Sequence, residues 1–350
     1  MKEIRLGLIG CGAMMDTHAK CVNEASMKLN ITAFCDIKIE NAQHVADALG
    51  VDAYITTDWK TMVDYVDAVL IALPHDLHYE CGVFFARHKK HILMEKPLCN
   101  TEEECLSLME ICEEEGVTLM CAYPVRYMPG IVKLKEMVDS GKYGKVMQMS
   151  IWTEQLTICE EGSWGGSARL GGGQLFSHGC HYVDILLWFL GNPVAGSHFG
   201  TKVGTPWMMR EGTSALIMKF ENGALGYHGA TWGARGTRLG FDFQIQMEKA
   251  MLEYDGRAKE VRIYEGEQKH VPGDSTYVIQ QNYEVVEKYE GGKMTQNEIL
   301  HFIDCVENGK TPLTDGYGSL QGLRVIWAVY DAEKHNTVAD LRGLGLNQGR

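Results

Sequence analysis

The 350-residue sequence contains no run of apolar residues that approaches the roughly 20 required by a membrane-spanning helix. Its first residues, MKEIRLGLIG, lack the apolar core and the small-residue cleavage site of a signal peptide. Basic side chains are in deficit, since 33 Lys and Arg face 46 Asp and Glu, and the net charge of −13 repels nucleic-acid phosphates and anionic lipids. We therefore predict a cytoplasmic protein that binds neither nucleic acid nor membranes.

Cysteine pairs at metal-binding or redox spacing are absent as well. The 11 cysteines are odd in number and scattered, and no two of them form a C-x-x-C motif. Two histidine pairs, His75 with His78 and His178 with His181, have the i, i+3 spacing that can present two imidazoles to a metal. Neither pair has an obvious third ligand beyond Asp184. We expect reduced, mostly buried cysteines, no disulfide framework and no metal site.

Length and composition indicate two ordinary globular domains. Hydrophobic residues make up 45% of the chain and charged residues 23%, and 350 residues exceed the roughly 100 to 200 of a single domain. The first third alternates short β-branched or apolar runs, beginning with IRLGLIG, with amphipathic stretches. This βαβ rhythm is typical of a parallel sheet covered by helices on both faces. It predicts an α/β Rossmann domain over residues 1–122.

The pattern changes beyond that domain. A strongly apolar helix, expected over about 174–190, follows a Gly-rich loop, and short strands separated by turn signals come after it. These features predict an α+β domain with a largely antiparallel open sheet over residues 123–315. A last helix, expected over about 316–335, is able to pack back on the first domain.

A Gly-x-Gly motif directly follows the first expected strand. Gly10 would permit a tight turn, and Gly12 would let the backbone approach a pyrophosphate held on the amides of a helix that begins with Ala13 and Met14. The third glycine of the usual fingerprint is replaced by Met15, which weakens the motif when it is taken alone. Because the motif lies between a strand and a helix within a βαβ repeat, it still predicts a dinucleotide site.

An acidic residue indicates which dinucleotide binds. Asp36 ends the second expected strand, about two dozen residues after Gly12. A carboxylate at this place accepts hydrogen bonds from the adenosine ribose hydroxyls and repels a 2′-phosphate. The sequence therefore predicts NAD, rather than NADP, as the cofactor.

Glu95, Lys96 and Pro97 close a later strand at the carboxyl edge of the sheet, where open α/β sheets place their ligands. There the ammonium of Lys96 would face the nicotinamide, hydrogen-bond a substrate hydroxyl and favour the developing alkoxide while hydride leaves the carbon. A lysine before a proline at a strand end is also common as a plain surface residue. The motif by itself leaves both interpretations open.

Five sequence blocks in the same order give most of the chain a resemblance to the Gfo/Idh/MocA oxidoreductase family. Several blocks in order are much more specific than any one of them. They are GLIGCGAMMDTH (7–18), ALPHDLHYE (72–80), HILMEKP (91–97), YPVRYMP (123–129) and GGGQLFSHGCHYVDILLWFLG (171–191).

The resemblance implies a Rossmann domain and a substrate domain whose open sheet commonly mediates oligomerisation, so a homodimer or homotetramer is expected. It also implies oxidation of a hydroxyl on a sugar, cyclitol or related polyol. In the family pattern Lys96 matches the catalytic lysine, His181 matches the active-site histidine, and the third glycine of the fingerprint is often absent. The expected cofactor-binding residues then include Glu95, Lys96, Leu73, Pro74, His75 and His78.

The last block also has a physical interpretation. On an α-helix, Ser177, His181 and Asp184 stand at i, i+4 and i+7 and share one stripe. An imidazole with a near-neutral pKa suits the removal of a hydroxyl proton, so His181 is the expected acid and base, with Asp184 orienting it or making a packing contact. The alternative is a buried histidine whose hydrogen bonds tie the two domains together.

The chain departs from the family pattern at Ser177, where many members carry Asp four residues before the histidine. The next residue, His178, belongs to a Ser-His-Gly stretch similar to the Thr-His-Gly of NAD-dependent glycosidases in the same superfamily. Those enzymes oxidise a sugar carbon, eliminate the aglycone, add water and reduce again, so NAD is recycled. His178 would then be the base, and a redox-neutral glycosidase is the alternative function.

Three further residues complete the expected substrate site, which also includes Ser177 and the two histidines. Tyr123 and Arg126 lie in the segment that joins the domains and would bind substrate hydroxyls, although a structural arginine fits equally well. Trp164 would stack on a sugar face or simply pack. We predict an NAD-dependent dehydrogenase. A non-catalytic NAD-binding sensor is a second alternative, against which the presence of Lys96 and His181 argues.

Overall fold

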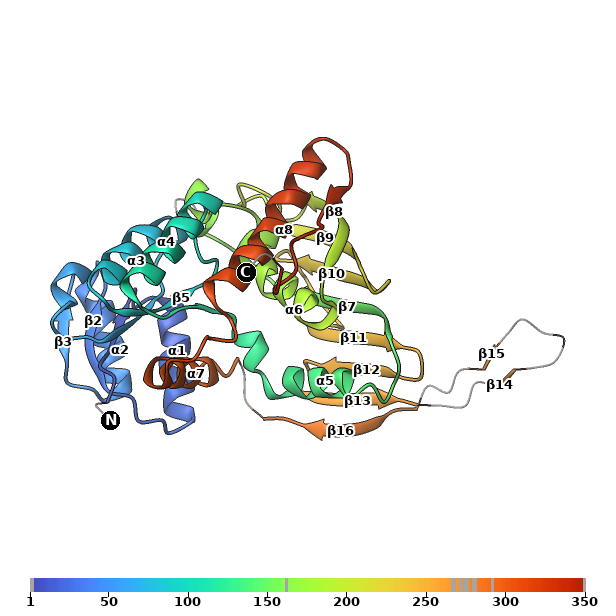
Figure 1. Cartoon of the computed structure of the whole chain (residues 1–350), viewed down its shortest axis with the longest axis horizontal. Helices are drawn as coiled ribbons and strands as arrows, with labels where there is room; N and C mark the ends of the chain where they lie inside the picture. Colours follow the sequence, from blue (N-terminus) through green and yellow to red (C-terminus); the bar gives the residue numbers. More distant parts are fainter. Residues whose placement is uncertain are drawn as a thin grey trace. The chain divides into compact units, whose positions relative to one another are not determined.

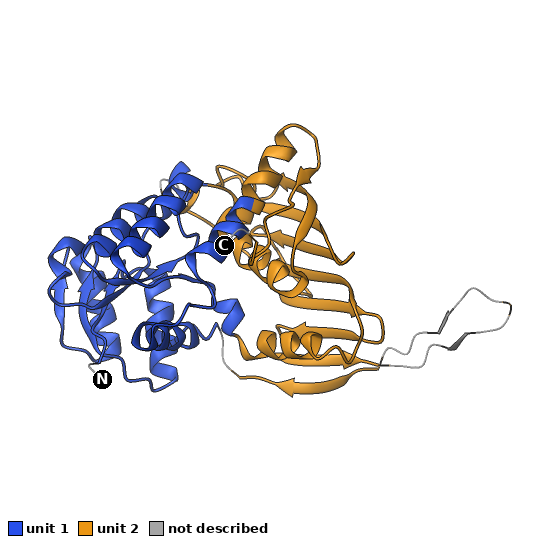
Figure 2. Cartoon of the chain, in the orientation of Figure 1, with its two compact units in different colours: residues 1–127, 167–171, 293–324 blue, residues 128–166, 172–292, 325–350 orange. Residues whose placement is uncertain are grey.

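The computed structural model describes residues 3–160, 163–265, 269, 270, 273, 277, 278, 282–290 and 293–348. The chain divides into two compact units, coloured separately in Figure 2. Unit 1 comprises Met1–Tyr127, Ser167–Gly171 and Lys293–Arg324, and unit 2 comprises Met128–Gly166, Gly172–Gly292 and Val325–Arg350. Among the helices in these described stretches, none combines the length and the apolar character needed to cross a bilayer.

Unit 1 is built on a six-stranded sheet in which every neighbouring pair is parallel (Figure 1). Its strand order is β3-β2-β1-β4-β5-β6. Such strands are buried on both faces, and β1 and β4 are accordingly apolar and buried throughout. The strands are β1 (Leu6–Ile9), β2 (Ile31–Cys35), β3 (Tyr54–Thr56), β4 (Ala68–Ile71), β5 (His91–Glu95) and β6 (Leu119–Ala122).

Helices follow the strands of unit 1 in the order that the βαβ rhythm predicts. They are α1 (Ala13–Glu24), α2 (Ile39–Leu49), α3 (His78–Arg87) and α4 (Glu102–Glu115). The start of α4 is fixed by a capping box, in which the Thr101 side chain accepts from Glu104 N and the Glu104 carboxylate accepts from Thr101 N.

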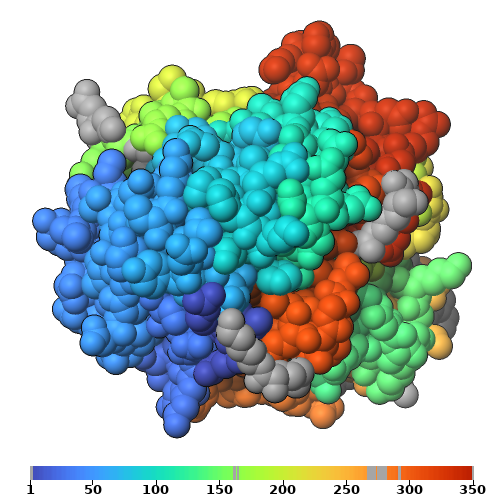
Figure 3. Space-filling model, turned by 60° about the vertical axis from the view of Figure 1, so that its left-hand side comes forward, coloured from blue at the N-terminus to red at the C-terminus, as the bar shows by residue number. Residues whose placement is uncertain are grey.

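A helix from late in the chain, α7 (Gln296–Asn308), completes the core of unit 1. Its Ile299 and Phe302 are buried in one cluster with Met15 of α1. In the space-filling view, the orange atoms of this part of the chain border blue atoms of its beginning (Figure 3). Residues about 280 positions apart in sequence thus share one core.

Unit 2 contains a nine-stranded sheet in the order β16-β13-β12-β11-β7-β10-β9-β8-β17. All neighbouring pairs are antiparallel except β7 and β10. Its strands are β7 (Val146–Glu154), β8 (Pro193–Thr201), β9 (Thr213–Phe220), β10 (Leu225–Thr231), β11 (Phe241–Met247), β12 (Met251–Asp255), β13 (Glu260–Tyr264), β16 (Glu284–Lys288) and β17 (Ala339–Asp340). The predicted fold class, a Rossmann domain with an α+β domain and a largely antiparallel sheet, is confirmed.

One face of the unit 2 sheet carries helices. The helix α5 (Pro129–Asp139) contacts β12 and β13, and α6 (Cys180–Leu190) contacts β7 and β10. A third helix, α8 (Gly316–Lys334), has its residues up to Arg324 in unit 1 and the rest in unit 2. The short pair β14 (Lys269–His270) and β15 (Tyr277–Val278) lies outside the main sheet.

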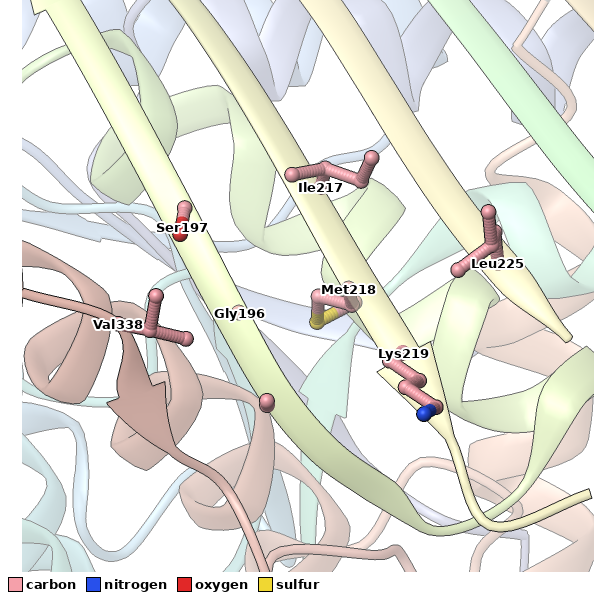
Figure 4. Close-up of a pocket in the computed structure, with 8 residues that line it drawn as sticks. Gly196, Ser197, Ile217, Met218, Lys219, Leu225 and Val338 are labelled. Carbon is pink, nitrogen blue, oxygen red and sulfur yellow. The ribbon is translucent and has the colours of Figure 1, made fainter. Parts of the chain in front are cut away.

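The other face of the same sheet exposes apolar side chains. Along β9 the burial alternates, so that Met218 is 1% exposed whereas Ile217 is 47% exposed. Figure 4 shows Ile217 with Ser197 of β8, Leu225 of β10 and Val338 around a shallow hollow on these strands.

Candidate functional site

The turn between β1 and α1 has the geometry of a dinucleotide-binding loop. Gly10 has φ +82°, and a Cβ at this position would overlap the carbonyl oxygen of Ala72, so only glycine fits. Gly12 is exposed, and a Cβ there would meet no protein atom within 4 Å. The third fingerprint position, Met15, is fully buried between the helix and the sheet.

The start of α1 offers backbone donors beside this turn. The first helical hydrogen bond runs from Asp16 N to Gly12 O (3.0 Å), so the amides of Ala13 and Met14 have no acceptor within the helix. Amides of this kind, at the positive end of a helix dipole, are suited to a pyrophosphate. The residues of this turn therefore fit the dinucleotide that the sequence predicts.

Asp36, immediately after β2, is fastened to the same turn. Its Oδ2 accepts a hydrogen bond from Cys11 N (2.8 Å), and its Oδ1 accepts from Lys38 N (2.8 Å) and Asn41 Nδ2 (3.1 Å). Oδ1 thus accepts two hydrogen bonds and Oδ2 only one, so Oδ2 has a further lone pair. The carboxylate is thus oriented by the protein and still able to accept from ribose hydroxyls.

The loop after β4 contains the next predicted cofactor residues. Leu73 and Pro74 lead into a short helical turn that begins with His75, whose Nδ1 lies 2.9 Å from Leu170 O. Burial, followed by the charges of His78 and Lys96, holds the pKa of His75 well below its ordinary value. His75 is therefore neutral at neutral pH.

His78 connects this loop to the strand that carries Lys96. The ring is fully buried, with Nδ1 2.8 Å from Pro97 O and Nε2 2.9 Å from Leu73 O. Burial lowers the pKa of His78, although both carbonyl contacts act in the opposite direction. Both ring nitrogens face backbone carbonyls, so the side chain fixes the positions of Leu73 and Pro97.

Glu95 and Lys96 stand at the carboxyl end of β5, as the sequence predicts. Glu95 is buried, and its Oε1 is hydrogen-bonded to His18 Nε2 of α1 at 2.9 Å, whereas its Oε2 accepts from Lys96 N at 3.2 Å. Burial alone would raise the pKa of Glu95, but the hydrogen bond with His18 and the charges of Lys293 and Lys96 lower it to about 2. Glu95 is therefore an ionised carboxylate next to Lys96.

The structure places Tyr123 and Arg126 in the interior of unit 1. Tyr123 is 1% exposed, with its hydroxyl 3.2 Å from Ser319 Oγ, and Arg126 is 4% exposed and donates from Nη1 to Leu313 O (3.2 Å). These bonds attach the segment after β6 to the segment that leads into α8. They are the contacts of structural anchors, which is the alternative that the sequence leaves open for Arg126.

In unit 2 the predicted helix over about 174–190 is present, but its first turns are wound differently. A π-helical stretch, Leu175–Gly179, precedes α6. Such stretches alter the angular spacing of side chains and are frequent at functional sites. Here the ring centroids of His178 and His181 are 5.8 Å apart. His178 is therefore close to His181, the residue expected to share a stripe with Ser177 and Asp184.

The two histidines have different surroundings. His181 is 1% exposed, and Ser177 and Asp184 are buried with it on the same helix. His178 is partly exposed, with Gln174 Nε2 3.4 Å from its Nδ1. Aromatic rings also surround His178, namely those of Tyr182, Trp232 and Phe241 at centroid distances of 5.3, 6.3 and 5.9 Å. His178 is therefore the more accessible imidazole, within a partly aromatic wall.

The start of this helix is anchored by a tyrosine and a glutamate. The hydroxyl of Tyr330 on α8 accepts from Gly173 N and Phe176 N, both at 3.3 Å, and donates to Glu211 Oε1. The same Glu211 oxygen accepts from Leu175 N at 3.2 Å. A Cβ at Gly173 would overlap the Glu211 carboxyl group, so the glycine permits this approach.

A buried layer beneath the histidines comes from the sheet. The ring of His228 on β10 stacks on Tyr182 of α6 with centroids 4.9 Å apart, and its Nε2 lies 2.9 Å from Thr153 Oγ1. Burial lowers the pKa of His228 to about 3, so it is neutral. This layer supports the helix and does not supply a proton acceptor.

The predicted residues fall into two groups according to the compact units. Unit 1 brings together the dinucleotide turn, Asp36, the loop after β4, and the Glu95 and Lys96 pair, and it also contains Tyr123 and Arg126. Unit 2 brings together Ser177, His178 and His181. Trp164 begins a short helical turn of unit 2, and its side chain lies outside the described part of the structure.

Several residues of these groups escape sequence reasoning. They are polar residues whose partners lie far away in the sequence, and long-range packing alone brings those partners to them. In unit 1 these are His18, Lys293 and Glu298, and in unit 2 they are Glu211, His228 and Tyr330.

Both halves of the chain match models of one protein family. The model described as "Oxidoreductase family, NAD-binding Rossmann fold" matches residues 4–123, and the "GFO/IDH/MocA C-terminal domain" model matches residues 131–253. The chain belongs to the Gfo/Idh/MocA family. It is thus an NAD(P)-dependent oxidoreductase with a Rossmann domain and the C-terminal domain of that family.

Relatives within the family act on different compounds. The scyllo-inositol 2-dehydrogenase (NAD(+)) of Bacillus subtilis (strain 168) is 23% identical over 92% of each chain. The 2,7-anhydro-N-acetylneuraminate hydratase of Escherichia coli (strain K12) is 24% identical over 76% of this chain and 74% of its own. A solved complex of levoglucosan dehydrogenase with NADH and levoglucosan has the same fold, with a TM-score of 0.83 over 97% of this chain and all of that one, at 19% identity.

Proposed function

We propose that the protein is an NAD-dependent dehydrogenase that oxidises a hydroxyl of a sugar, cyclitol or sugar derivative. The observation that carries this proposal is the position of Lys96 at the carboxyl end of β5, in the same unit as the glycine turn. Asp36, whose Oδ2 accepts from Cys11 N, supports NAD over NADP because a carboxylate beside the glycine turn would repel a 2′-phosphate.

Each side chain of the site has a distinct task in this reaction. NAD held by the glycine turn and Asp36 would supply the acceptor for the hydride that leaves the substrate carbon. The Lys96 ammonium donates a hydrogen bond to the reacting hydroxyl and stabilises the alkoxide, while an imidazole takes the hydroxyl proton as the carbonyl forms. We assign that imidazole to His181, assisted by His178. Ser177 and Trp164 are proposed to contact the substrate, with Tyr123 and Arg126 supporting the segment next to it.

A redox-neutral reaction is the second candidate, and the exposure of His178 favours it. His178 stands in a Ser-His-Gly stretch and is more exposed than His181. An accessible base of this kind could abstract a proton from the carbon next to a transient carbonyl, so that a glycosidic or ether oxygen leaves. Addition of water and return of the hydride then regenerate NAD. The hydratase among the relatives supports keeping this alternative.

One assay separates these functions. The purified protein is incubated with free sugars, inositols and nitrophenyl glycosides, with and without NAD, while NADH and nitrophenol are followed together. Growth of NADH with a free polyol supports the dehydrogenase, and NAD-dependent nitrophenol release without net NADH supports the glycosidase. Absence of both, together with tight NAD binding, would instead support a sensor.

Matched variants then test the assigned residues. Lys96→Met should lower kcat by at least about 100-fold, the usual loss when a donor that stabilises a developing oxyanion is removed. Lys60→Met, which changes an exposed lysine of the same unit, should leave kcat unchanged. His181→Ala should abolish dehydrogenase turnover, whereas a larger loss in His178→Ala would favour the redox-neutral reaction.

We further propose that the exposed face of β8, β9 and β10 joins copies of the chain into a homodimer or homotetramer. Ile217 and Leu225 on this face are 47% and 40% exposed, and contiguous apolar surface of this kind is typical of interaction sites (Figure 4). Ile217→Glu should reduce the mass measured by light scattering. The mass of a monomer for both the wild type and Ile217→Glu would contradict the proposal.

A further inference from the structure

Four ionisable side chains lie together in the interior of unit 1, next to Lys96. His18 comes from α1, Glu95 ends β5, and Lys293 and Glu298 belong to the segment that begins α7. One donor atom from each of His18, Glu95 and Glu298 lies within 4.8 Å of the others. His18 and Glu95 lie in two of the sequence blocks quoted above, but no motif connects them with Lys293 and Glu298. The hydride-transfer chemistry described above does not require this group.

Glu298 is the exceptional member of the group. Its side chain is fully buried, and neither of its carboxyl oxygens has a hydrogen-bond partner among the described residues. Among the described residues, no ion pair joins Lys293 to Glu298. The Lys293 ammonium instead lies 3.8 Å from Met14 Sδ. A buried carboxylate that has neither a hydrogen-bond donor nor a close ion pair is strongly unfavourable.

The neighbouring carboxylate makes ionisation of Glu298 less favourable still. Glu95 is ionised, because His18 and two lysines stabilise its negative charge. Two buried carboxyl groups this close share one proton, as in a carboxylate dyad. Burial, and then the charge of Glu95, raise the pKa of Glu298 well above its ordinary value. The proton of the pair therefore resides on Glu298.

The other ionisable groups near Glu298 do not change the conclusion that Glu298 holds the proton. Lys293 is the positive group, and burial lowers its own pKa. The groups that face Glu298 are His18 and Cys21 of α1, Glu95 of β5, Lys293, and Tyr127 of the turn after β6.

We propose that Glu298 is a neutral carboxylic acid in the folded protein at neutral pH, and that it is a positioning residue for Lys96. By holding the proton, it leaves Glu95 as the single buried negative charge of the pair, and Glu95 in turn accepts from the backbone of Lys96. The role assigned to Lys96 rests on the proposed dehydrogenase function, whereas the protonation of Glu298 does not.

The protonation is tested by stability as a function of pH. The folded protein keeps a proton on Glu298 that the unfolded chain releases above about pH 4.3, so this residue costs stability progressively as the pH rises above that value. Glu298→Gln removes the effect. We expect the variant to match the wild type in acid and to exceed it at neutral pH, with the ratio of unfolding constants changing by up to about tenfold per pH unit.

Two further measurements keep this test decisive. Infrared spectra of the wild type at neutral pH should contain the carbonyl band of a protonated carboxyl group, which is missing in Glu298→Gln. Glu307→Gln, at an exposed position on the same helix, should change neither the band nor the pH dependence. Destabilisation of Glu298→Gln at neutral pH, or a stoichiometric metal lost together with stability, would overturn the proposal in favour of an ionised ligand.

The positioning role is tested by kinetics. Glu298→Ala should lower kcat at least tenfold with little change in the Kd of NAD, and the neutral, isosteric Glu298→Gln should restore most of the lost kcat. A purely structural role would lower the melting temperature of Glu298→Ala but leave the kcat of its folded fraction unchanged. If no substrate is turned over at all, the infrared and stability results still decide the protonation, so the two proposals fail separately.

Discussion

Tyr330 of α8 and Glu211, two residues before β9, form a buried hydrogen-bonded pair that fixes the start of the helix carrying His178 and His181. The Tyr330 hydroxyl also accepts from two backbone amides of that first turn, at 3.3 Å each. A helix start that is buried needs such partners, because its first N–H groups have none within the helix. The pair therefore controls where the candidate substrate histidines stand in unit 2.

Tyr330→Phe should lower kcat/KM for the substrate about tenfold or more, because the buried Glu211 carboxylate and two amides lose their partner at a cost of about 1–3 kcal/mol for each unsatisfied group. The Kd of NAD should not change, since the dinucleotide residues belong to unit 1. Glu333→Gln is the matched control, because Glu333 lies on the same helix but pairs with His198 at 2.8 Å. Equal losses in both variants would argue against a specific anchor.

Asp36→Ala should weaken NAD binding about tenfold and narrow the preference for NAD over NADP by at least as much. The carboxylate would no longer accept from the ribose or repel a 2′-phosphate. Titration of both dinucleotides by protein fluorescence measures the ratio, and Asp52→Ala, at an exposed position in the same unit, is the control. An unchanged ratio would remove Asp36 from the cofactor site.

The two glycines of the dinucleotide turn should respond differently to alanine. Gly12→Ala should fold with unchanged stability, because a Cβ there meets no protein atom within 4 Å, but it should bind NAD at least tenfold more weakly through its contact with the pyrophosphate. Gly10→Ala should yield little folded protein, because residue 10 has φ +82° and the new Cβ would overlap Ala72. Tight NAD binding by Gly12→Ala would show that the dinucleotide lies elsewhere.

Asp242 on β11 predicts a pH dependence in unit 2. It is 8% exposed, and burial raises its pKa to about 6, against the hydrogen bond from Gly256 N. The folded state thus holds a proton that the unfolded state releases, and stability contributed by this residue falls as the pH rises from about 4 to about 6.

Asp242→Asn should therefore be more stable than the wild type above pH 6, by at most about 3 kcal/mol, since one pKa unit corresponds to about 1.4 kcal/mol. Below about pH 4 the two proteins should unfold at the same urea concentration. Asp331→Asn, at an exposed position in unit 2, serves as the control and should show no such dependence.

Local sequence patterns determined the framework of this protein. Alternating apolar and amphipathic stretches predicted the Rossmann sheet, because parallel strands and their helices leave periodic signals within a few residues. The glycine turn, Asp36 and the position of Lys96 at the end of β5 were also predictable, since each follows a strand directly in the chain. For the same reason the apolar helix from Gln174 was found, although its π-helical first turns were not.

Tertiary structure alone decided which distant side chains meet. Glu298 reaches His18 because α7 packs into the core of unit 1 through Ile299 and Phe302. Tyr330 reaches Glu211 across 119 positions of sequence. Neither contact leaves a periodic signal, because a single polar residue acquires its partner, its burial and its protonation state only when packing removes water from both. The sequence by itself therefore determined the elements and the residues at their ends, and packing determined the buried polar partners that control them.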